Sequence, residues 1–263
     1  MDFLLECIGF PPDQDLHALA QIARERGERL PWRGAAGEHL RLALGSGLEV
    51  RLDRASPLAA WSLTPWYQSA RRVRVALDRI AFPADAPDDA LVSGWANPPV
   101  DDQPDAPDPD SYPMRALLSD ARRLPRTLQR GHVLAMSLAG FALEVTYVGP
   151  DSGARDPLIL GLPYAAAIEA LGGSDDPGGC LEVSLRVRSV VRLENPLTQR
   201  RVELLEVETP GRALPFFVSP WQLEIDRLPP PRSGWRIEGT FYVCGRIAGG
   251  LGGPSQRVGE SFG

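Results

Sequence analysis

Lysine is absent from this chain, so all 28 positions counted as lysine or arginine are arginine. A P-loop needs a lysine on the nucleotide phosphates, and Schiff-base enzymes need a lysine amine. The absence therefore excludes Walker-type nucleoside triphosphatases and enzymes that use pyridoxal phosphate.

Cysteine is also scarce. Cys7, Cys180 and Cys244 are the only three, and they lie far apart in the sequence. This number and spacing give neither a disulfide framework nor a CxxC metal knuckle. They are typical of a protein from a reducing compartment. We therefore expect a cytoplasmic protein.

Signals for export or for membrane insertion are missing as well. The N-terminus carries Asp2 and Glu6 and has no basic region, which is unlike a signal peptide. The longest apolar stretch, at residues 157–168, is shorter than the ~20 residues that a membrane helix needs. The sequence therefore predicts a soluble protein with no membrane partner.

Histidine occurs only as His17, His39 and His132, with no HxH or HxxxH spacing. A metal site in a protein usually combines several histidine, cysteine or carboxylate ligands. The one candidate set is His39 with Glu49 or Glu144, which a metal-dependent enzyme of the glyoxalase type would need. We therefore predict no catalytic residue, no metal and no cofactor, and favour a protein that is not an enzyme.

The chain has 263 residues, of which 43% are hydrophobic and 24% are charged. This composition is that of a globular protein, with one large domain or two small ones. The net charge is -6. Because phosphate contacts dominate nucleic-acid affinity, binders of DNA or RNA are usually basic. The acidic balance therefore disfavours nucleic acid as a partner.

The sequence begins with a predicted strand at residues 2–10 and a helix after it. The helix is indicated by apolar residues recurring at i, i+3, i+4 and i+7, namely Leu16, Leu19, Ala20 and Ala23. Asp13 or Asp15 is placed to cap its start, and Gly27 to end it. A second, short helix is predicted at residues 164–171, before Gly172-Gly173.

Most of the remaining pattern alternates with the period of a β-strand. It predicts a hairpin at residues 40–52 and further strands at 71–80, 89–96, 131–138, 141–148, 181–193, 202–208, 214–219 and 235–243. Residues 99–112 are rich in proline and aspartate and predict a solvated loop. The fold class is therefore α+β, predominantly antiparallel β.

Sequence markers recur in the same order in the two halves of the chain, which indicates a degenerate tandem duplication. Arg79-Ile80 matches Arg192-Leu193, Pro98 matches Pro210, Arg123-Leu124-Pro125 matches Arg227-Leu228-Pro229, and Gly131-His132 matches Gly234-Trp235. We interpret residues 1–130 and 131–248 as two β-rich repeats, followed by a flexible glycine-rich tail at 249–263.

Short strands joined by turn signals favour small antiparallel barrels in both repeats, of the OB type. The second repeat fits an OB-like barrel best, from its long first strand at 181–193 to the closing strand that Gly234 opens. The first repeat, with its leading strand and helix, also fits a βαβββ unit of the glyoxalase type. Both interpretations of the first repeat stay open.

Three segments resemble a family of bacterial proteins that is defined by a domain of unknown function. They are Ile8-Gly9-Phe10, the run from Glu194 to Thr198 with the strand after it, and the closing strand with Gly234, Gly239 and Gly245. The resemblance covers mainly the last 65 or so residues, and Gln199 stands where the family tends to have glycine. It implies a bacterial source and carries no activity or site residue.

Arginines and aromatic residues are the remaining candidates for ligand contacts. An OB barrel that binds single strands combines basic strand positions with aromatic residues that stack on bases. The residues that fit this pattern are Arg72, Arg74, Arg186, Arg188, Trp66, Trp221 and Trp235. The alternative is a solvated face on which arginine stems cover apolar surface.

We therefore expect a non-enzymatic binding or protein-interaction module, which has an unknown protein partner or forms a homo-oligomer. Binding of single-stranded nucleic acid or another polyanion is the first alternative. A small metal-dependent enzyme of glyoxalase-like architecture is the second.

Overall fold

The structure is a computed structural model that describes residues 2–31, 37–83, 86, 88–99, 109–124, 128–149, 163–171 and 179–248. It is mostly antiparallel β-sheet with few helices, as the sequence predicts. None of the helices in these ranges is long and apolar enough to cross a membrane. The loop residues 100–108, Gly172-Gly173 and the tail 249–263 lie outside the described residues.

The first element, η1 (Asp2–Ile8), is a 3-10 helix, so the strand predicted at residues 2–10 is wrong. Its buried residues are Leu4, Leu5, Cys7 and Ile8. They follow the spacing of a helical turn and not the alternation of a strand. An apolar run this short does not distinguish the two structures by itself.

The predicted helix is confirmed as α1 (Leu16–Arg26). The side chain of Asp15 caps it by accepting hydrogen bonds from the backbone N–H groups of His17 and Ala18, at 2.9 and 3.1 Å. Leu19, Ala20 and Ala23 bury one face of the helix.

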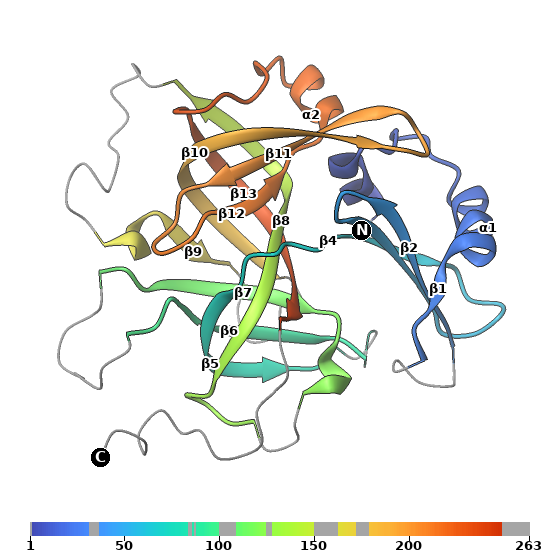
Figure 1. Cartoon of the computed structure of the whole chain (residues 1–263), viewed down its shortest axis with the longest axis horizontal. Helices are drawn as coiled ribbons and strands as arrows, with labels where there is room; N and C mark the ends of the chain where they lie inside the picture. Colours follow the sequence, from blue (N-terminus) through green and yellow to red (C-terminus); the bar gives the residue numbers. More distant parts are fainter. Residues whose placement is uncertain are drawn as a thin grey trace.

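A four-stranded antiparallel sheet follows, made of β1 (Glu28–Arg29), β2 (Glu38–Gly45), β3 (Leu48–Arg54) and β4 (Ser62–Tyr67), in that order. The hairpin predicted at residues 40–52 is its centre. The turn between β2 and β3 has positive φ at Gly45, Ser46 and Gly47, a conformation that glycine adopts without a steric penalty. Figure 1 shows this sheet and α1 to one side of the remaining strands.

The remaining strands form one sheet with extra pairings. They are β5 (Val73–Ala81), β6 (Ala90–Ala96), β7 (Tyr112–Leu118), β8 (Val133–Val148), β9 (Ile168–Ala170), β10 (Cys180–Asn195), β11 (Arg200–Val207), β12 (Leu214–Phe217) and β13 (Arg236–Ile247). Three short helices lie between them: η3 (Ala121–Arg123), η4 (Tyr164–Ala166) and α2 (Pro220–Ile225).

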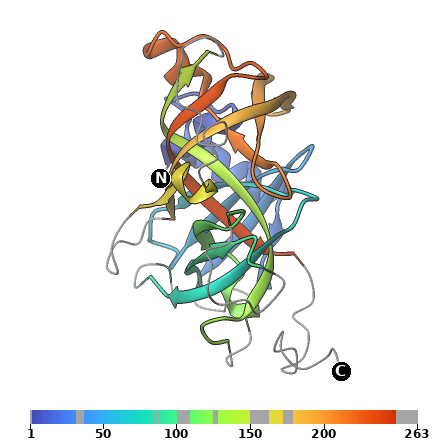
Figure 2. The same cartoon turned by 90° about the vertical axis from the view of Figure 1, so that its left-hand side faces the viewer.

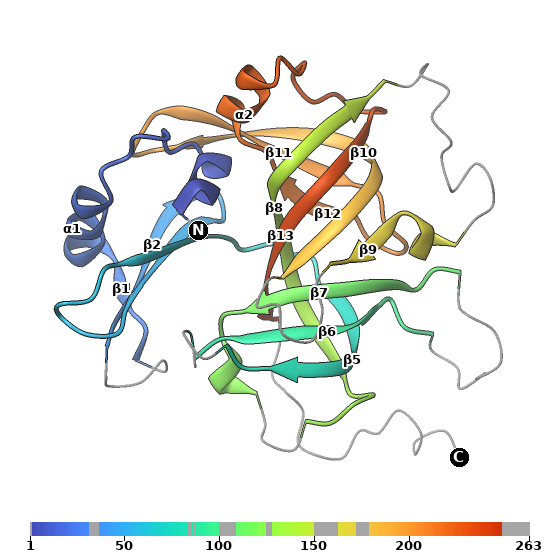
Figure 3. The same cartoon turned by 180° about the vertical axis from the view of Figure 1, so that it is seen from behind.

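The pairings close two rings of five strands that share β8 and β13. Ring one runs β5–β6–β7–β13–β8 and back to β5. Ring two runs β10–β11–β12–β8–β13 and back to β10. Figures 1 and 3 show ring two above ring one, and Figure 2 shows β8 and β13 crossing from one ring into the other.

The series β5 to β8 and the series β10 to β13 make the same contacts. In each, the first two pairings are antiparallel, the third strand pairs in parallel with the last strand of the other series, and a short helix precedes the last strand. The first strand of each carries an irregularity at one place, after Leu77 in β5 and after Val187 in β10.

Two other predicted elements differ from the structure. The strands predicted at 131–138 and 141–148 are one strand, β8. A Cβ at Gly140, within β8, would lie 3.0 Å from the ring of Phe216, so this glycine permits close packing within the continuous strand. The helix predicted at 164–171 is wrong, because only residues 164–166 are helical and β9 follows.

Candidate functional site

Trp66, one of the predicted ligand residues, is buried between the four-stranded sheet and β13. It is 1% exposed. The guanidinium carbons of Arg51 and Arg246 each lie 5.1 Å from the centroid of its ring. Cation–π contacts of this kind are strongest when they are desolvated. In this position Trp66 packs in the interior and offers no face to a ligand.

Arg51 is the centre of a buried ionic network. Its Nε lies 2.6 Å from Asp53 and its Nη2 lies 2.7 Å from Asp89. Burial opposes its charge, but the two carboxylates outweigh burial and raise the pKa of Arg51 above its usual range. Nearby, Glu49 accepts a hydrogen bond of 2.6 Å from Arg246. These charges are paired within the protein, so the network ties the four-stranded sheet to β13 and to the β5–β6 connection.

His39, the histidine of the candidate metal set, belongs to the same network. Its Nδ1 lies 2.8 Å from Asp53 and its Nε2 lies 3.8 Å from Asp88. Glu49, the ligand suggested beside it, is held by Arg246 and Arg41 instead. Within the described ranges, no group of three or more histidine, cysteine, aspartate or glutamate side chains is placed to hold a metal ion.

Two of the three thiols lie in the core. Burial raises the pKa of Cys7 to about 12, and burial likewise raises the pKa of Cys244. A thiol attacks as its thiolate, so a raised pKa suppresses nucleophilic chemistry. Cys180 is partly exposed at the start of β10.

The predicted arginines lie on or next to the first strands of the two series. Arg72 directly precedes β5 and Arg74 lies on it, and both are exposed. Arg186 lies on β10, 4.0 Å from Glu208, and Arg188 is exposed at the irregularity of the same strand. Arg188 is joined to the connection before β13, because Ser233 Oγ donates to its backbone carbonyl at 2.6 Å.

A hollow of about 890 Å³ lies in ring two beside this contact, and we name it the arginine trough. It lies between the β10–β11 hairpin and the segment that leads into β13. Its lining residues are Val190, Val191, Arg192, Arg201, Glu203, Pro230, Pro231, Arg232 and Ser233. An adjoining hollow of about 310 Å³ shares Arg201, Glu203 and Pro230 and adds apolar side chains, including Val218, Leu223 and Leu228. The two together offer a cationic part and an apolar part.

The arginines of the trough are only partly neutralised. Arg201 pairs with Glu203 at 2.6 Å. Arg192 and Arg232 have no carboxylate partner within the described part of the chain. Arg232 stacks on Trp235, 5.4 Å from the ring centroid. Trp235 and Arg188, two of the predicted ligand residues, therefore lie beside the trough, whereas Arg192, Arg201 and Arg232 were not predicted.

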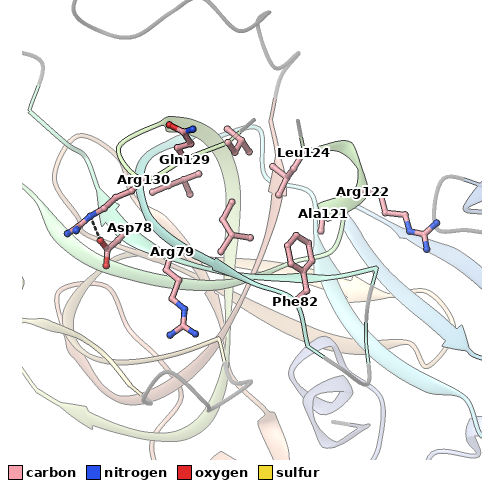
Figure 4. Close-up of a pocket in the computed structure, with 11 residues that line it drawn as sticks. Asp78, Arg79, Phe82, Ala121, Arg122, Leu124, Gln129 and Arg130 are labelled. Atoms are coloured by element: carbon pink, nitrogen blue, oxygen red, sulfur yellow. Dashed lines mark ion pairs between the residues drawn. The ribbon is translucent and has the colours of Figure 1, made fainter. Parts of the chain in front are cut away.

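Ring one has a hollow of about 680 Å³ in the equivalent place, between β5 and the connection that leads into β8. Two of its three arginines are paired, Arg130 with Asp78 at 2.7 Å and Arg122 with Asp88, whereas Arg79 has no ion pair among the described residues. Figure 4 shows Arg130 turned toward Asp78, Arg122 turned outward, and the Phe82 ring below Ala121 and Leu124. The lining of this hollow mixes polar and apolar side chains, and most of its arginines are paired within the protein.

Trp221, the last predicted residue, lies on α2, with the guanidinium of Arg200 6.0 Å from its ring centroid.

Comparison of the chain with protein-family models, with curated proteins and with solved structures finds no match. The site is therefore interpreted from its own geometry and charge.

Proposed function

We propose that this protein is a non-enzymatic interaction module that binds an acidic segment of a partner protein in the arginine trough. We further propose that it arose by duplication of an OB-like unit, with residues 73–148 and 180–247 as the two copies, in place of a division after residue 130. The shared order of pairings and the equivalent irregularities after Leu77 and Val187 support the duplication.

The arginines of the trough carry the proposal. In ring one, Asp78 and Asp88 pair with Arg130 and Arg122, and one lining arginine, Arg79, has no ion pair among the described residues. In ring two, two lining arginines, Arg192 and Arg232, have no carboxylate partner among the described residues. Unpaired guanidinium groups at the edge of a hollow are ready donors for a carboxylate or a phosphate. In a chain with a net charge of -6, such a local excess marks a place for an anionic partner.

A protein segment fits the trough better than single-stranded nucleic acid does. Nucleic acid would need free aromatic faces for its bases, but Arg232 covers Trp235 and Arg200 covers Trp221. The apolar lining of the adjoining hollow instead suits a peptide that carries an apolar side chain between its carboxylates.

The experiment is a titration of labelled acidic peptides and of oligothymidylate by fluorescence anisotropy, against wild-type protein and the R192Q/R232Q variant. The control variant is R72Q/R74Q, which removes two exposed arginines elsewhere. We expect peptide binding that weakens about tenfold in R192Q/R232Q, since two exposed ion pairs together contribute about 1–2 kcal/mol, and that is unchanged in the control. Trough-dependent binding of the oligonucleotide instead, or no binding of any acidic ligand, would overturn the proposal.

A further inference from the structure

Strand β10 has an open backbone edge beside the trough. Its pairing with β13 ends at Arg186. From Ser189 to Asn195 the strand pairs with β11 alone, and in the described part of the chain no other strand lies along the opposite side of this stretch. We name that side the open edge. In Figures 1 and 3 it belongs to the β10–β11 hairpin, which extends from ring two below α2.

Three residues direct their backbone groups to the open edge. Alternate residues of a strand direct N–H and C=O to opposite sides. The carbonyl of Asn195 faces the β11 side, where it accepts from the N–H of Gln199 at 2.7 Å, and the register with β11 is regular along the whole open edge. The backbone groups of Val190, Arg192 and Glu194 therefore face the other side. Among the described residues they have no hydrogen-bond partner there.

The trough gives access to the open edge. Val190, Val191 and Arg192 all line it, although consecutive strand residues point to opposite faces, so the trough reaches around the side of β10. Its far wall is formed by residues 230–233, which follow Pro229. Two of these four residues are also prolines, which have no backbone N–H. This wall does not continue the ladder that β13 makes, and a segment with its own donors and acceptors has a place between the two.

The unpaired arginines of the trough are spaced for an extended chain. Ser233, next to Arg232, donates to the carbonyl of Arg188, which precedes Arg192 by four residues. Four residues of a strand span about 13 Å. A single small anion does not bridge this distance. Two carboxylates four residues apart on an extended segment do so, and they lie on the same face of it.

We propose that the acidic segment of the partner binds as an added strand on the open edge of β10. This inference rests on the proposed function of the trough and names how the partner is held. The backbone of the segment exchanges hydrogen bonds with Val190, Arg192 and Glu194, and its carboxylates bind Arg192 and Arg232. A second copy of the open edge is a poorer occupant, because it offers one carboxylate, that of Glu194, and brings another Arg192 with it.

Hydrogen exchange, measured by NMR on the full chain labelled with nitrogen-15, tests the added strand. The probe is a peptide of alternating aspartate and valine about eight residues long, which covers the open edge. At saturating peptide we expect exchange at the amides of Val190, Arg192 and Glu194 to slow about tenfold or more. The amides of Val191 and Leu193 face β11 already, so they should change little and serve as the internal control.

Methylated versions of the same peptide provide a second measurement. Methylation of the backbone nitrogen at every second residue removes the donors on one side of an extended peptide only. Two versions, methylated at the aspartates or at the valines, therefore differ in which side is blocked. We expect one to bind at least about tenfold more weakly than the other, because it loses two or more hydrogen bonds to β10.

The outcomes separate this inference from the proposed function. If the peptide binds and R192Q/R232Q weakens it, but the three edge amides stay unprotected or both methylated versions bind equally, the added strand is wrong and the proposed function stands. If no acidic peptide binds, the proposed function fails as well. Protection of the same amides without peptide, rising with protein concentration, would identify a second copy as the occupant and overturn the inference.

Discussion

Gly131 and Gly234 make the same contact in the two rings. Each donates its backbone N–H to the carbonyl of the residue before the irregularity in the first strand, Gly131 to Leu77 at 2.7 Å and Gly234 to Val187 at 2.8 Å. Each has a positive φ, +87° and +82°. In return, Leu77 and Val187 donate to the carbonyls of His132 and Trp235. These reciprocal bonds join the first and last strands of each series.

Substitution of either glycine should therefore destabilise the protein through the backbone alone. A Cβ at Gly131 or Gly234 meets no atom within 4 Å. We expect G131A and G234A to lower the free energy of unfolding by similar amounts, about 1–2 kcal/mol each, because alanine is strained in the left-handed region. Asparagine should cost less at both positions. Urea unfolding measures these changes in the free energy of unfolding. A loss for alanine well above the strain of the left-handed region would show that the substitution also disturbs packing.

Removal of Arg51 should be among the most damaging single changes. Its loss leaves Asp89, which is 2% exposed, as a buried charge without its guanidinium partner. We expect R51A to lower the free energy of unfolding by about 3–5 kcal/mol. The double variant R51A/D89N should recover part of this loss, because it also removes the buried charge of Asp89. Chemical denaturation of R51A, D89N and R51A/D89N gives the free-energy changes of a double-mutant cycle. If the changes of the two single variants add up to that of the double variant, the pairing of Arg51 with Asp89 is contradicted.

Asp120 should make the protein less stable as the pH rises. Burial raises the pKa of this carboxyl, against the opposing effects of the Ile247 N–H, Arg123 and Arg246. An acid whose folded pKa lies above its unfolded value of about 3.9 is bound to its proton more tightly in the folded state. Asp120 therefore stabilises the folded state most below its unfolded pKa, and this stabilisation declines as the pH rises to its folded pKa.

The D120N variant tests this sign. Asparagine keeps an oxygen that accepts from the Ile247 N–H, which lies 3.2 Å from the carboxylate, and it has no charge to desolvate. We expect D120N to raise the Tm at neutral pH and to lose that advantage near pH 3. A difference in Tm that does not vary between pH 3 and pH 7 would show that Asp120 is not the titrating group.

Thiol labelling of the native protein should be limited to Cys180. Cys7 and Cys244 are 1% exposed with raised pKa values, whereas Cys180 is partly exposed. We expect a disulfide reagent to label one thiol in native protein and three in denaturant, with the native signal lost in C180S. Rapid labelling of C180S without denaturant would mean that the core around Cys7 or Cys244 opens.

Local patterns predict local elements well in this chain. The cap at Asp15 and the alternation of residues 40–52 are signals of the adjacent sequence, and both elements are confirmed. Strand β4 has four consecutive buried residues and includes Pro65, so it has no alternation to detect. The closing of the rings depends on pairs such as Gly140 with Val243, which are remote in sequence. No local pattern encodes such pairs.

The candidate site was predictable only in part for the same reason. Arg188 and Trp235 were predicted because they fit a pattern of basic strand positions and stacking aromatic residues, and both lie beside the trough. Arg192 and Arg232 were not predicted as site residues, because arginines on a strand or after a run of prolines are usually solvated. Their significance depends on packing that brings Pro230 and Pro231 against β10.

The exchange of β8 and β13 between the rings makes the two copies inseparable. A chain that ended after β8 would hold four strands of ring one and lack the fifth, which only β13 supplies. A protein with a single copy would therefore complete its barrel only by lending its last strand to an identical molecule and taking one in return. Under the proposed duplication, this chain corresponds to a strand-swapped dimer whose two subunits were later fused into one gene product.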